Sequence, residues 1–167
     1  DTYRLCLMNM FLHGMDGSVI HGDALTHDAD DLTSPDVIIA NPPFGTSVGG
    51  ARARRDDLPF RTSNKQCLSH QRIVKSMPAG GRAAVVLPDN VLFEENVGRE
   101  IRIWLMEQCD LHTILRLPVG IFYAQGVKTN AIFFTKIGEE ETNSTKEVWF
   151  YDMRAQMPSF RKARPLS

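Results

Sequence analysis

The sequence has no apolar run that approaches the ~20 residues of a membrane-spanning helix, and no signal peptide is visible at its start. It also has no Cys-x-x-Cys pair. Its three cysteines, Cys6, Cys67 and Cys109, are odd in number and far apart, as in proteins whose thiols stay reduced. These absences predict a cytoplasmic chain with free thiols.

Little in the sequence favours a metal site or a partner attracted by overall charge. The histidines show no pairing at the helical spacing of metal ligands; they are His13, His21, His27, His70 and His112. The formal net charge of -1 gives no general attraction to nucleic acid or membrane. We therefore expect no metal and no membrane, and a nucleic-acid partner would have to be met by a local patch.

The composition is that of an ordinary globular chain. With 167 residues, 43% hydrophobic and 23% charged, it is long enough to bury roughly two-thirds of its unfolded surface. There are no internal repeats, so one domain is expected. The sequence opens at Asp1-Thr2-Tyr3 without an initiator methionine or a leading strand, which suggests a fragment of a longer protein.

Hydrophobic patterning predicts helices that alternate with strands. The expected helices cover 2–13, 67–77 and 97–109, and the expected strands cover 19–21, 36–40, 82–87, 112–117, 131–136 and 148–151. The first helix is apolar on most faces, so we expect it to be buried between other elements. The order of elements predicts an α/β fold, a doubly wound and mostly parallel sheet that ends in an antiparallel hairpin.

The most informative stretch is the run from Asp36 to Ala40 and the turn that stops it. Five residues without polar alternation suit a strand buried on both faces of a parallel sheet. Asn41-Pro42-Pro43-Phe44 then ends the strand, because a second proline cannot continue a central ladder and each proline restricts the residue before it. A rigid turn therefore presents an amide and an aromatic ring at the carboxyl end of a strand, the edge where ligands bind in open α/β sheets.

This turn suits a planar group that bears an exocyclic amine. The side-chain carbonyl of Asn41 and the main-chain carbonyl of Pro42 could each accept one N–H, while Phe44 stacks on the ring. Two acceptors localise the lone pair of the nitrogen and make it a better nucleophile, and the prolines fix both carbonyls in advance. The predicted chemistry is attack by an amino nitrogen on an electrophilic carbon.

Two further features of the sequence each allow both a functional and a purely structural interpretation. Asp23 places a carboxylate at the end of the expected 19–21 strand, and a helix N-cap or an Asx turn explains it equally well. The long span between Gly45 and Asn64 could hold phosphates, although a solvated loop is the favoured interpretation. The possible phosphate contacts are Arg52, Arg54, Arg55, Arg61 and Lys128.

Four stretches together carry a family resemblance: 41–44, 61–64, 80–93 and 126–130. Over residues 1 to about 155 the sequence resembles the modification (M) subunit of type I restriction-modification systems, a family of N6-adenine DNA methyltransferases. The resemblance implies a partial catalytic domain of the S-adenosylmethionine-dependent methyltransferase fold at 1–155, followed by an exit segment at 156–167. The family's N-terminal domain and glycine-rich cofactor loop would precede Asp1, and its C-terminal helices are also missing.

The resemblance implies transfer of a methyl group from S-adenosylmethionine to N6 of an adenine flipped out of duplex DNA. Asn41 and Pro42 would orient the amine, and Phe44 would stack on one face of the base. Phe122, with Tyr123 as second choice, would stack on the other. Asp23 would hydrogen-bond the adenine amine of the cofactor.

The implied partners are double-stranded DNA and the specificity and restriction subunits of the same system. Because most of the cofactor cradle would lie outside this sequence, we expect the fragment alone to be inactive. Two alternatives stay open: an N-methyltransferase that acts on RNA adenine or protein glutamine, and a non-catalytic module that docks subunits or DNA.

Overall fold

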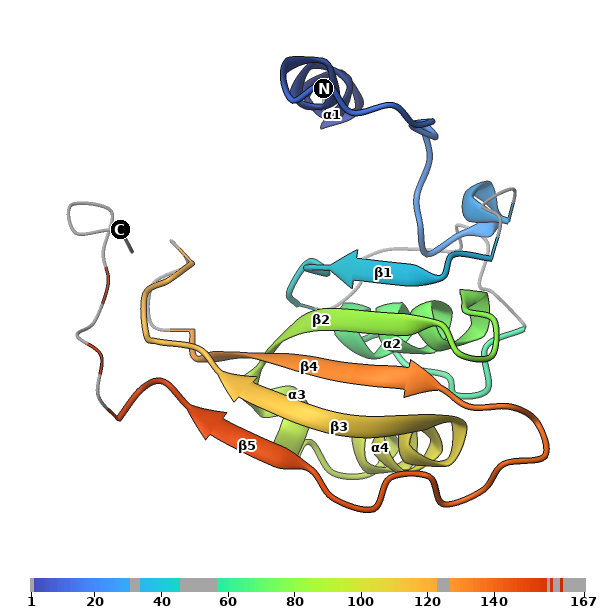
Figure 1. The fold of residues 1–167 in the computed structure, drawn as a ribbon, viewed down its shortest axis with the longest axis vertical. Helices are drawn as coiled ribbons and strands as arrows, with labels where there is room; N and C mark the ends of the chain where they lie inside the picture. The colour runs from blue at the N-terminus through green and yellow to red at the C-terminus, as the bar shows by residue number, and fades with distance from the viewer. Residues whose placement is uncertain are drawn as a thin grey trace.

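A mixed sheet of five strands organises the chain in the computed structural model, which describes residues 2–30, 34–45, 57–122, 127–155, 157 and 160. The strands lie in the order β1-β2-β4-β3-β5 and are β1 Val37–Ala40, β2 Arg82–Pro88, β4 Thr129–Lys136, β3 Cys109–Arg116 and β5 Trp149–Asp152. The β1–β2 and β3–β5 pairs are parallel, and β4 is antiparallel to both of its neighbours (Figure 1). The α/β class and the late antiparallel hairpin of β3 and β4 are confirmed.

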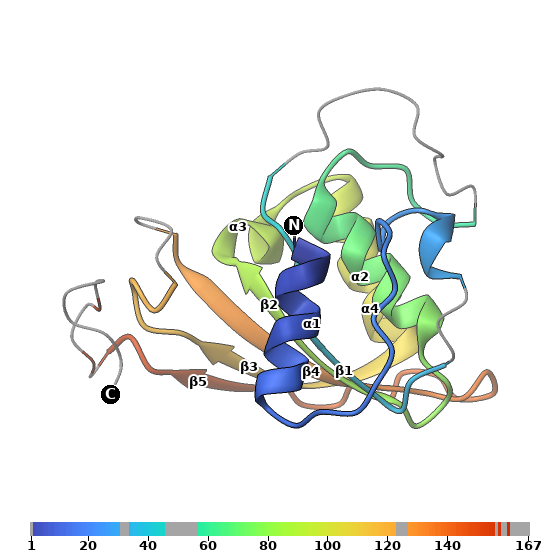
Figure 2. The same ribbon diagram turned by 90° about the horizontal axis from the view of Figure 1, so that it is seen from above.

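Helices α2 (Lys65–Ser76), α3 (Asp89–Phe93) and α4 (Val97–Gln108) lie together on one face of the sheet (Figure 2). The core lies between these helices and the sheet, where Val74, Val85 and Phe134 have no exposed surface. Alternation in β2 follows the same division, because Val85 and Leu87 are buried towards the helices while Val86 is half-buried on the other face. Among the described residues no helix covers that other face.

The first helix forms as predicted but is not buried. Helix α1 covers Thr2–Leu12, and Gly14 follows it with a φ of +60°, the left-handed geometry of a helix C-terminus. None of its residues is buried, and it stands beyond the β1 edge of the sheet (Figure 1). Leu5 and Phe11 are 68% and 84% exposed. The expectation that other elements surround this helix is wrong for this chain, because no described element packs against its apolar sides.

Two strand predictions also need correction. The strand at 36–40 forms as β1, but among the described strands β1 lies at the edge of the sheet and pairs with β2 alone, so Ile39 is 84% exposed and the expected burial on both faces does not occur. Residues 19–21 form no strand, because no described segment pairs with them. Patterning also missed α3 and a 3₁₀ helix, η1 (His27–Ala29). No described helix is long and apolar enough to cross a membrane.

Candidate functional site

The Asn41–Phe44 turn lies at the carboxyl end of β1. Pro42 is buried and Phe44 is half-buried, whereas the Asn41 side chain is exposed. Gly45 follows with a φ of +107°, a geometry that favours glycine, and its carbonyl accepts a hydrogen bond from the Lys65 amide at 3.1 Å. The turn is therefore fastened to the first residue of α2 and presents an amide outward.

The N-terminus of α2 is itself held in place by Asn64. The side-chain oxygen of Asn64, Oδ1, accepts hydrogen bonds from the amides of Gln66 and Cys67 at 3.0 and 3.3 Å, which caps the helix. The same side chain donates to Glu94 Oε2 at 2.9 Å, just after α3. This bond joins α2 to α3 at the edge of the sheet where the Asn41–Phe44 turn lies.

A second polar cluster occupies the carboxyl ends of β2, β3 and β5 and the start of β4. The Arg154 guanidinium binds both oxygens of Asp89, at 2.9 and 2.6 Å. It also donates to the carbonyls of Leu117 and Thr129 at 3.0 and 2.8 Å. Asn130 Nδ2 donates to Asp89 Oδ1 at 2.8 Å. We call these five residues the Arg154 clamp; it fixes the ends of four strands relative to one another.

The titration of Asp89 follows from this geometry. The Arg154 guanidinium lowers the pKa of the Asp89 carboxyl below its usual range, and the Asn130 amide adds to the shift against the opposing effect of burial. A carboxylate that is ionised and doubly hydrogen-bonded is a poor proton acceptor. Asp89 is therefore suited to holding structure rather than to general-base catalysis.

Cys67 is the described thiol nearest to this edge, and it stays protonated. Burial, together with the negative charge of Glu94, raises the pKa of Cys67 to about 11. Burial likewise raises the pKa of Cys109 to about 12. All three cysteines are free, as the sequence predicts, and neither buried thiol is a nucleophile at neutral pH.

Phe122 lies in the connection from β3 to β4, between two of the clamp's anchoring carbonyls, Leu117 and Thr129. Its side chain is half-buried. Gly120, two residues earlier, has a φ of +83°, and the Phe160 carbonyl approaches it so closely that a β-carbon would collide. Phe160 also donates its amide to the Val119 carbonyl at 2.9 Å. The part of the connection just before Phe122 is therefore held by Phe160; Tyr123 lies outside the described residues.

Asp23 forms the Asx turn that was one of its two interpretations. Its Oδ1 accepts from the Leu25 amide at 2.9 Å, and its amide donates to Asp28 at 3.1 Å. Asp30, which follows η1, pairs with Arg72, seven residues along α2 from Lys65 and so about 10 Å further down the helix. The structure thus does not bring Asp23 together with the Asn41–Phe44 turn.

The predicted phosphate contacts are placed only in part. Arg61 and Lys128 are exposed, whereas Arg52, Arg54 and Arg55 lie outside the described residues. The described residues contain no group of three or more histidine, cysteine or acidic side chains that could hold a metal. Sequence reasoning missed the Arg154 clamp. The available signal was a polar residue at the end of a core strand in two of the stretches that carry the resemblance: Asp89 follows β2, and Asn130 is the second residue of β4.

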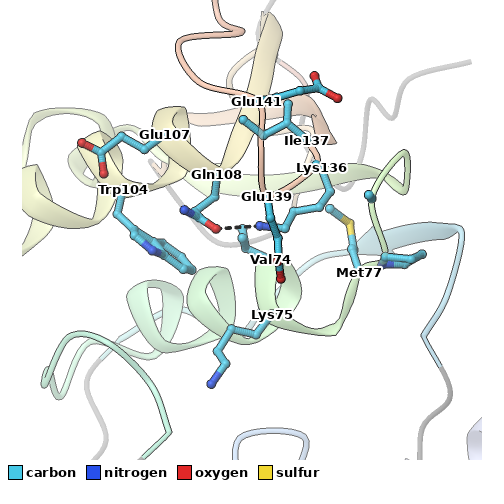
Figure 3. Close-up of a pocket in the computed structure, with 13 residues that line it drawn as sticks. Val74, Lys75, Met77, Trp104, Glu107, Gln108, Lys136, Ile137, Glu139 and Glu141 are labelled. Carbon is cyan, nitrogen blue, oxygen red and sulfur yellow. Dashed lines mark hydrogen bonds between the residues drawn. The ribbon is translucent and has the colours of Figure 1, made fainter.

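A cavity of about 570 Å³ lies at the opposite edge of the sheet. It is lined by Trp104, Gln108 and Lys136 among others, and Lys136 donates to Gln108 Oε1 at 2.8 Å (Figure 3). Lys136 is the last residue of β4 and accepts from Gly80, just before β2 begins. The cavity is therefore at the amino end of β2, away from the Asn41–Phe44 turn.

Comparison with protein families shows to which family the chain belongs. The family model described as N-6 DNA Methylase matches residues 1–167, the whole chain. The chain belongs to the N-6 DNA methylase family. The resemblance found in the sequence is confirmed at this level. The proposed boundary between residues 155 and 156 stays a prediction, since most of 156–167 lies outside the described residues.

Relatives within the N-6 DNA methylase family are close. The chain is 49% identical to the type I restriction enzyme StySPI methylase subunit of Salmonella potsdam and to the EcoKI methylase subunit of Escherichia coli K12, in each case over 99% of its length. It covers 33% of each relative. The chain thus spans about a third of the length of the curated relatives it matches.

Solved structures agree with this membership. The crystal structure of the EcoKI M protein matches 98% of the chain with a TM-score of 0.84 and 48% identity, and the chain covers 36% of that structure. A structure from a study of complex assembly in the type I restriction-modification system matches 98% with a TM-score of 0.78 and 30% identity, with 34% of it covered. A Listeria monocytogenes structure assigned to the class I S-adenosylmethionine-dependent methyltransferases matches 89% of the chain at 20% identity with a TM-score of 0.69, with 45% of it covered, and shares the fold.

Proposed function

We propose that this chain is the acceptor half of the catalytic domain of an adenine-specific DNA methyltransferase, the modification subunit of a type I restriction-modification system. Its acceptor is N6 of an adenine flipped out of duplex DNA. The proposed partners of the parent protein are DNA, a specificity subunit and a restriction subunit. The proposed location is the cytoplasm, where the DNA of its bacterial relatives lies. Family membership supports the reaction class, and the site geometry supports the residue roles.

The observation that carries this proposal is the fastened turn at the carboxyl end of β1. The exposed Asn41 amide and the Pro42 carbonyl are the two acceptors for the hydrogens of the adenine amine, and Phe44 is one stacking surface. Their bonds to the amine localise its lone pair on nitrogen. As N6 gains a methyl group, the bond from that carbon to its leaving group breaks with its electron pair, and N6 loses one proton, which Asp89 is unsuited to accept because Arg154 already holds it.

S-adenosylmethionine is the proposed methyl donor, since the fold is that of S-adenosylmethionine-dependent methyltransferases. It would supply an electrophilic methyl group. The described residues do not form a cradle for it: the candidate contact, Asp23, is exposed and lies with η1, towards the other end of α2. We therefore assign only acceptor binding to this chain.

The decisive test is Asn41→Ala in the full-length parent, assembled with its partner subunits. We expect methyl transfer from tritiated S-adenosylmethionine to site-containing DNA to collapse, because one of the two amine acceptors is gone. Phe44→Ala should be milder, since stacking is worth about 1–3 kcal/mol per base. If Asn41→Ala leaves methylation intact, the chain is a non-catalytic docking module instead.

The 167-residue chain alone should transfer no methyl group and bind the cofactor weakly or undetectably. The assay is the same tritium incorporation, with equilibrium dialysis for the cofactor. Clear incorporation into adenine would overturn the division between acceptor and donor halves. Digestion of the parent's product to nucleosides and amino acids would show whether DNA adenine, RNA adenine or glutamine carries the label.

A further inference from the structure

Arg154 closes the base of the connection between β3 and β4. Its Nε donates to the Leu117 carbonyl at the start of the connection, and its Nη2 donates to the Thr129 carbonyl at the end. The Leu117 amide also donates to the Thr129 carbonyl at 3.0 Å, which brings the two ends together. Phe122 lies between these two anchor points. One guanidinium therefore sets where this aromatic connection leaves the sheet.

The same guanidinium links the β3–β4 connection to the end of β2, the strand next to β1 and its Asn41–Phe44 turn. Both of its terminal nitrogens bind Asp89, the first residue after β2. Strand β2 pairs in parallel with β1, with Ala40 opposite Val85, so Asn41 and Asp89 follow neighbouring strands at one edge of the sheet. The Asp89 amide adds a bond to the Lys128 carbonyl at 2.9 Å.

We propose that Arg154 is a positioning residue for the target base: through the Arg154 clamp it sets the place of Phe122 relative to Asn41 and Phe44. The inference rests on the proposed function, because it concerns the second stacking surface of the same site. Arg154 touches neither base nor cofactor in this assignment. Its effect on methyl transfer passes through Phe122.

The clamp is built for fixed geometry rather than for surface charge. The Arg154 side chain is only 11% exposed, and its planar fork binds a carboxylate and two carbonyls at once, an arrangement that the ammonium of lysine cannot reproduce. A neighbouring pair provides a matched comparison. Arg116, the last residue of β3, binds Asp152, the last residue of β5, at 3.0 Å, but both side chains are more than a third exposed, and the Arg116 side chain donates to no described residue of the connection. Exposed ion pairs of this kind contribute little to the stability of the folded protein.

The test uses the full-length parent with its partner subunits and compares Arg154→Lys with the control Arg116→Lys. We expect Arg154→Lys to lower kcat about 10- to 100-fold, because the second stacking surface is displaced. The KM for DNA and the Kd for S-adenosylmethionine should change by less than about twofold, since uniform binding is retained. Arg116→Lys should leave all three values unchanged.

A spectroscopic measurement separates positioning from general destabilisation. With 2-aminopurine in place of the target adenine, stacking between two aromatic rings quenches emission from the flipped base. Arg154→Lys should raise this emission as Phe122→Ala does. The double variant should be no slower than Phe122→Ala alone, because both substitutions remove one contact. Asp89→Asn, which keeps the shape of the clamp while removing its charge, should fall between Arg154→Lys and the wild type.

Three results would overturn the inference: an unchanged kcat in Arg154→Lys, unchanged 2-aminopurine emission, or additive losses in the double variant. Each is distinguishable from failure of the proposed function. If Asn41→Ala abolishes methylation while Arg154→Lys behaves as wild type, the proposed function stands and the positioning role fails. If Asn41→Ala remains active, the proposed function itself fails.

Discussion

His70 is an ionisable side chain that is buried inside the protein. It lies in α2, is 4% exposed, and its Nε2 has no hydrogen-bond partner within the described part of the chain. Burial lowers the pKa of His70 from about 6.5 to about 4, because a charged imidazolium would lose its hydration. The ring is therefore neutral at the pH of the cell, and its protonation opposes folding.

This burial predicts a stability that falls on mild acidification. Between pH 6.5 and about 4 the unfolded chain binds a proton at residue 70 that the folded chain does not bind, so the free energy of unfolding decreases as the pH is lowered. The full effect is roughly 3 kcal/mol, from the difference in pKa. Urea titrations of the chain at pH 7.5 and 5, followed by tryptophan fluorescence, measure it. His70→Gln should flatten this dependence, and an identical slope in the variant would contradict the account.

At the scale of single residues, the sequence predicted chemistry shared by neighbouring residues, but it did not predict which residues far apart in the chain pair with each other. Asn41, Pro42 and Phe44 lie within four residues of one another, so their proposed joint role could be inferred from spacing alone. Arg154 and Asp89 lie 65 residues apart, and nothing in either local sequence names the other as partner. Asp23 is an intermediate case: its Asx turn was one of the interpretations of the sequence, but its distance from the Asn41–Phe44 turn depends on how η1 packs against α2.

At the scale of secondary-structure elements, the stability of helix α2 depends on its N-cap residue, Asn64. Asn64→Ala removes the oxygen that accepts from two helix amides and the amide that binds Glu94. We expect a loss of about 1 kcal/mol in the free energy of unfolding, the usual value of an N-cap. Because Lys65 anchors Gly45, the loss should also loosen the Asn41–Phe44 turn, which hydrogen exchange at the Lys65 amide would report.

Asn64→Asp is the matched control for the helix cap. The carboxylate still accepts from Gln66 and Cys67 and favours the positive end of the helix dipole, but it cannot donate to Glu94. Exchange at Lys65 that stays slow in this variant assigns the anchoring to the cap. Exchange as fast as in Asn64→Ala would assign it to the Glu94 bond instead.

Strong periodicity predicted whole elements, and weak periodicity did not. Helix α4 and strands β2 and β4 formed within about two residues of their expected bounds, since each carries a long apolar pattern. The three residues at 19–21 were too short to specify a strand without a partner. The exposure of β1 could not be read from its own residues, because an edge strand and a central strand differ in what lies beside them.

The whole molecule exposes an apolar face. Register places Ile39, Ala84, Phe133, Thr113 and Trp149 in one row across the sheet, on the side away from α2, α3 and α4. Ile39 and Trp149 are 84% and 72% exposed at its two ends. Both edge strands, β1 and β5, also present unpaired backbone among the described residues. Apolar patches of this kind promote association.

We therefore expect the isolated chain to self-associate over about 1–100 μM, where exposed sheet surfaces make contact. Sedimentation velocity at increasing concentration measures this. Ile39→Lys should shift the chain towards monomer, whereas Ile103→Lys, a similar change at a 41% exposed position on α4, should not. If the chain sediments as a monomer at every concentration, exposure of this apolar face does not drive self-association and the prediction is wrong.

The Arg154 clamp can form only late in the synthesis of the chain. Every residue that it binds, from Asp89 to Asn130, leaves the ribosome before Arg154 does. A growing chain can pair β2, β3 and β4 through their own backbone bonds, since hairpin contacts are close in sequence and form early. Closing the base of the aromatic connection must wait for β5 and the residues after it. The proposed acceptor site is thus a late product of folding, completed after the sheet that carries it.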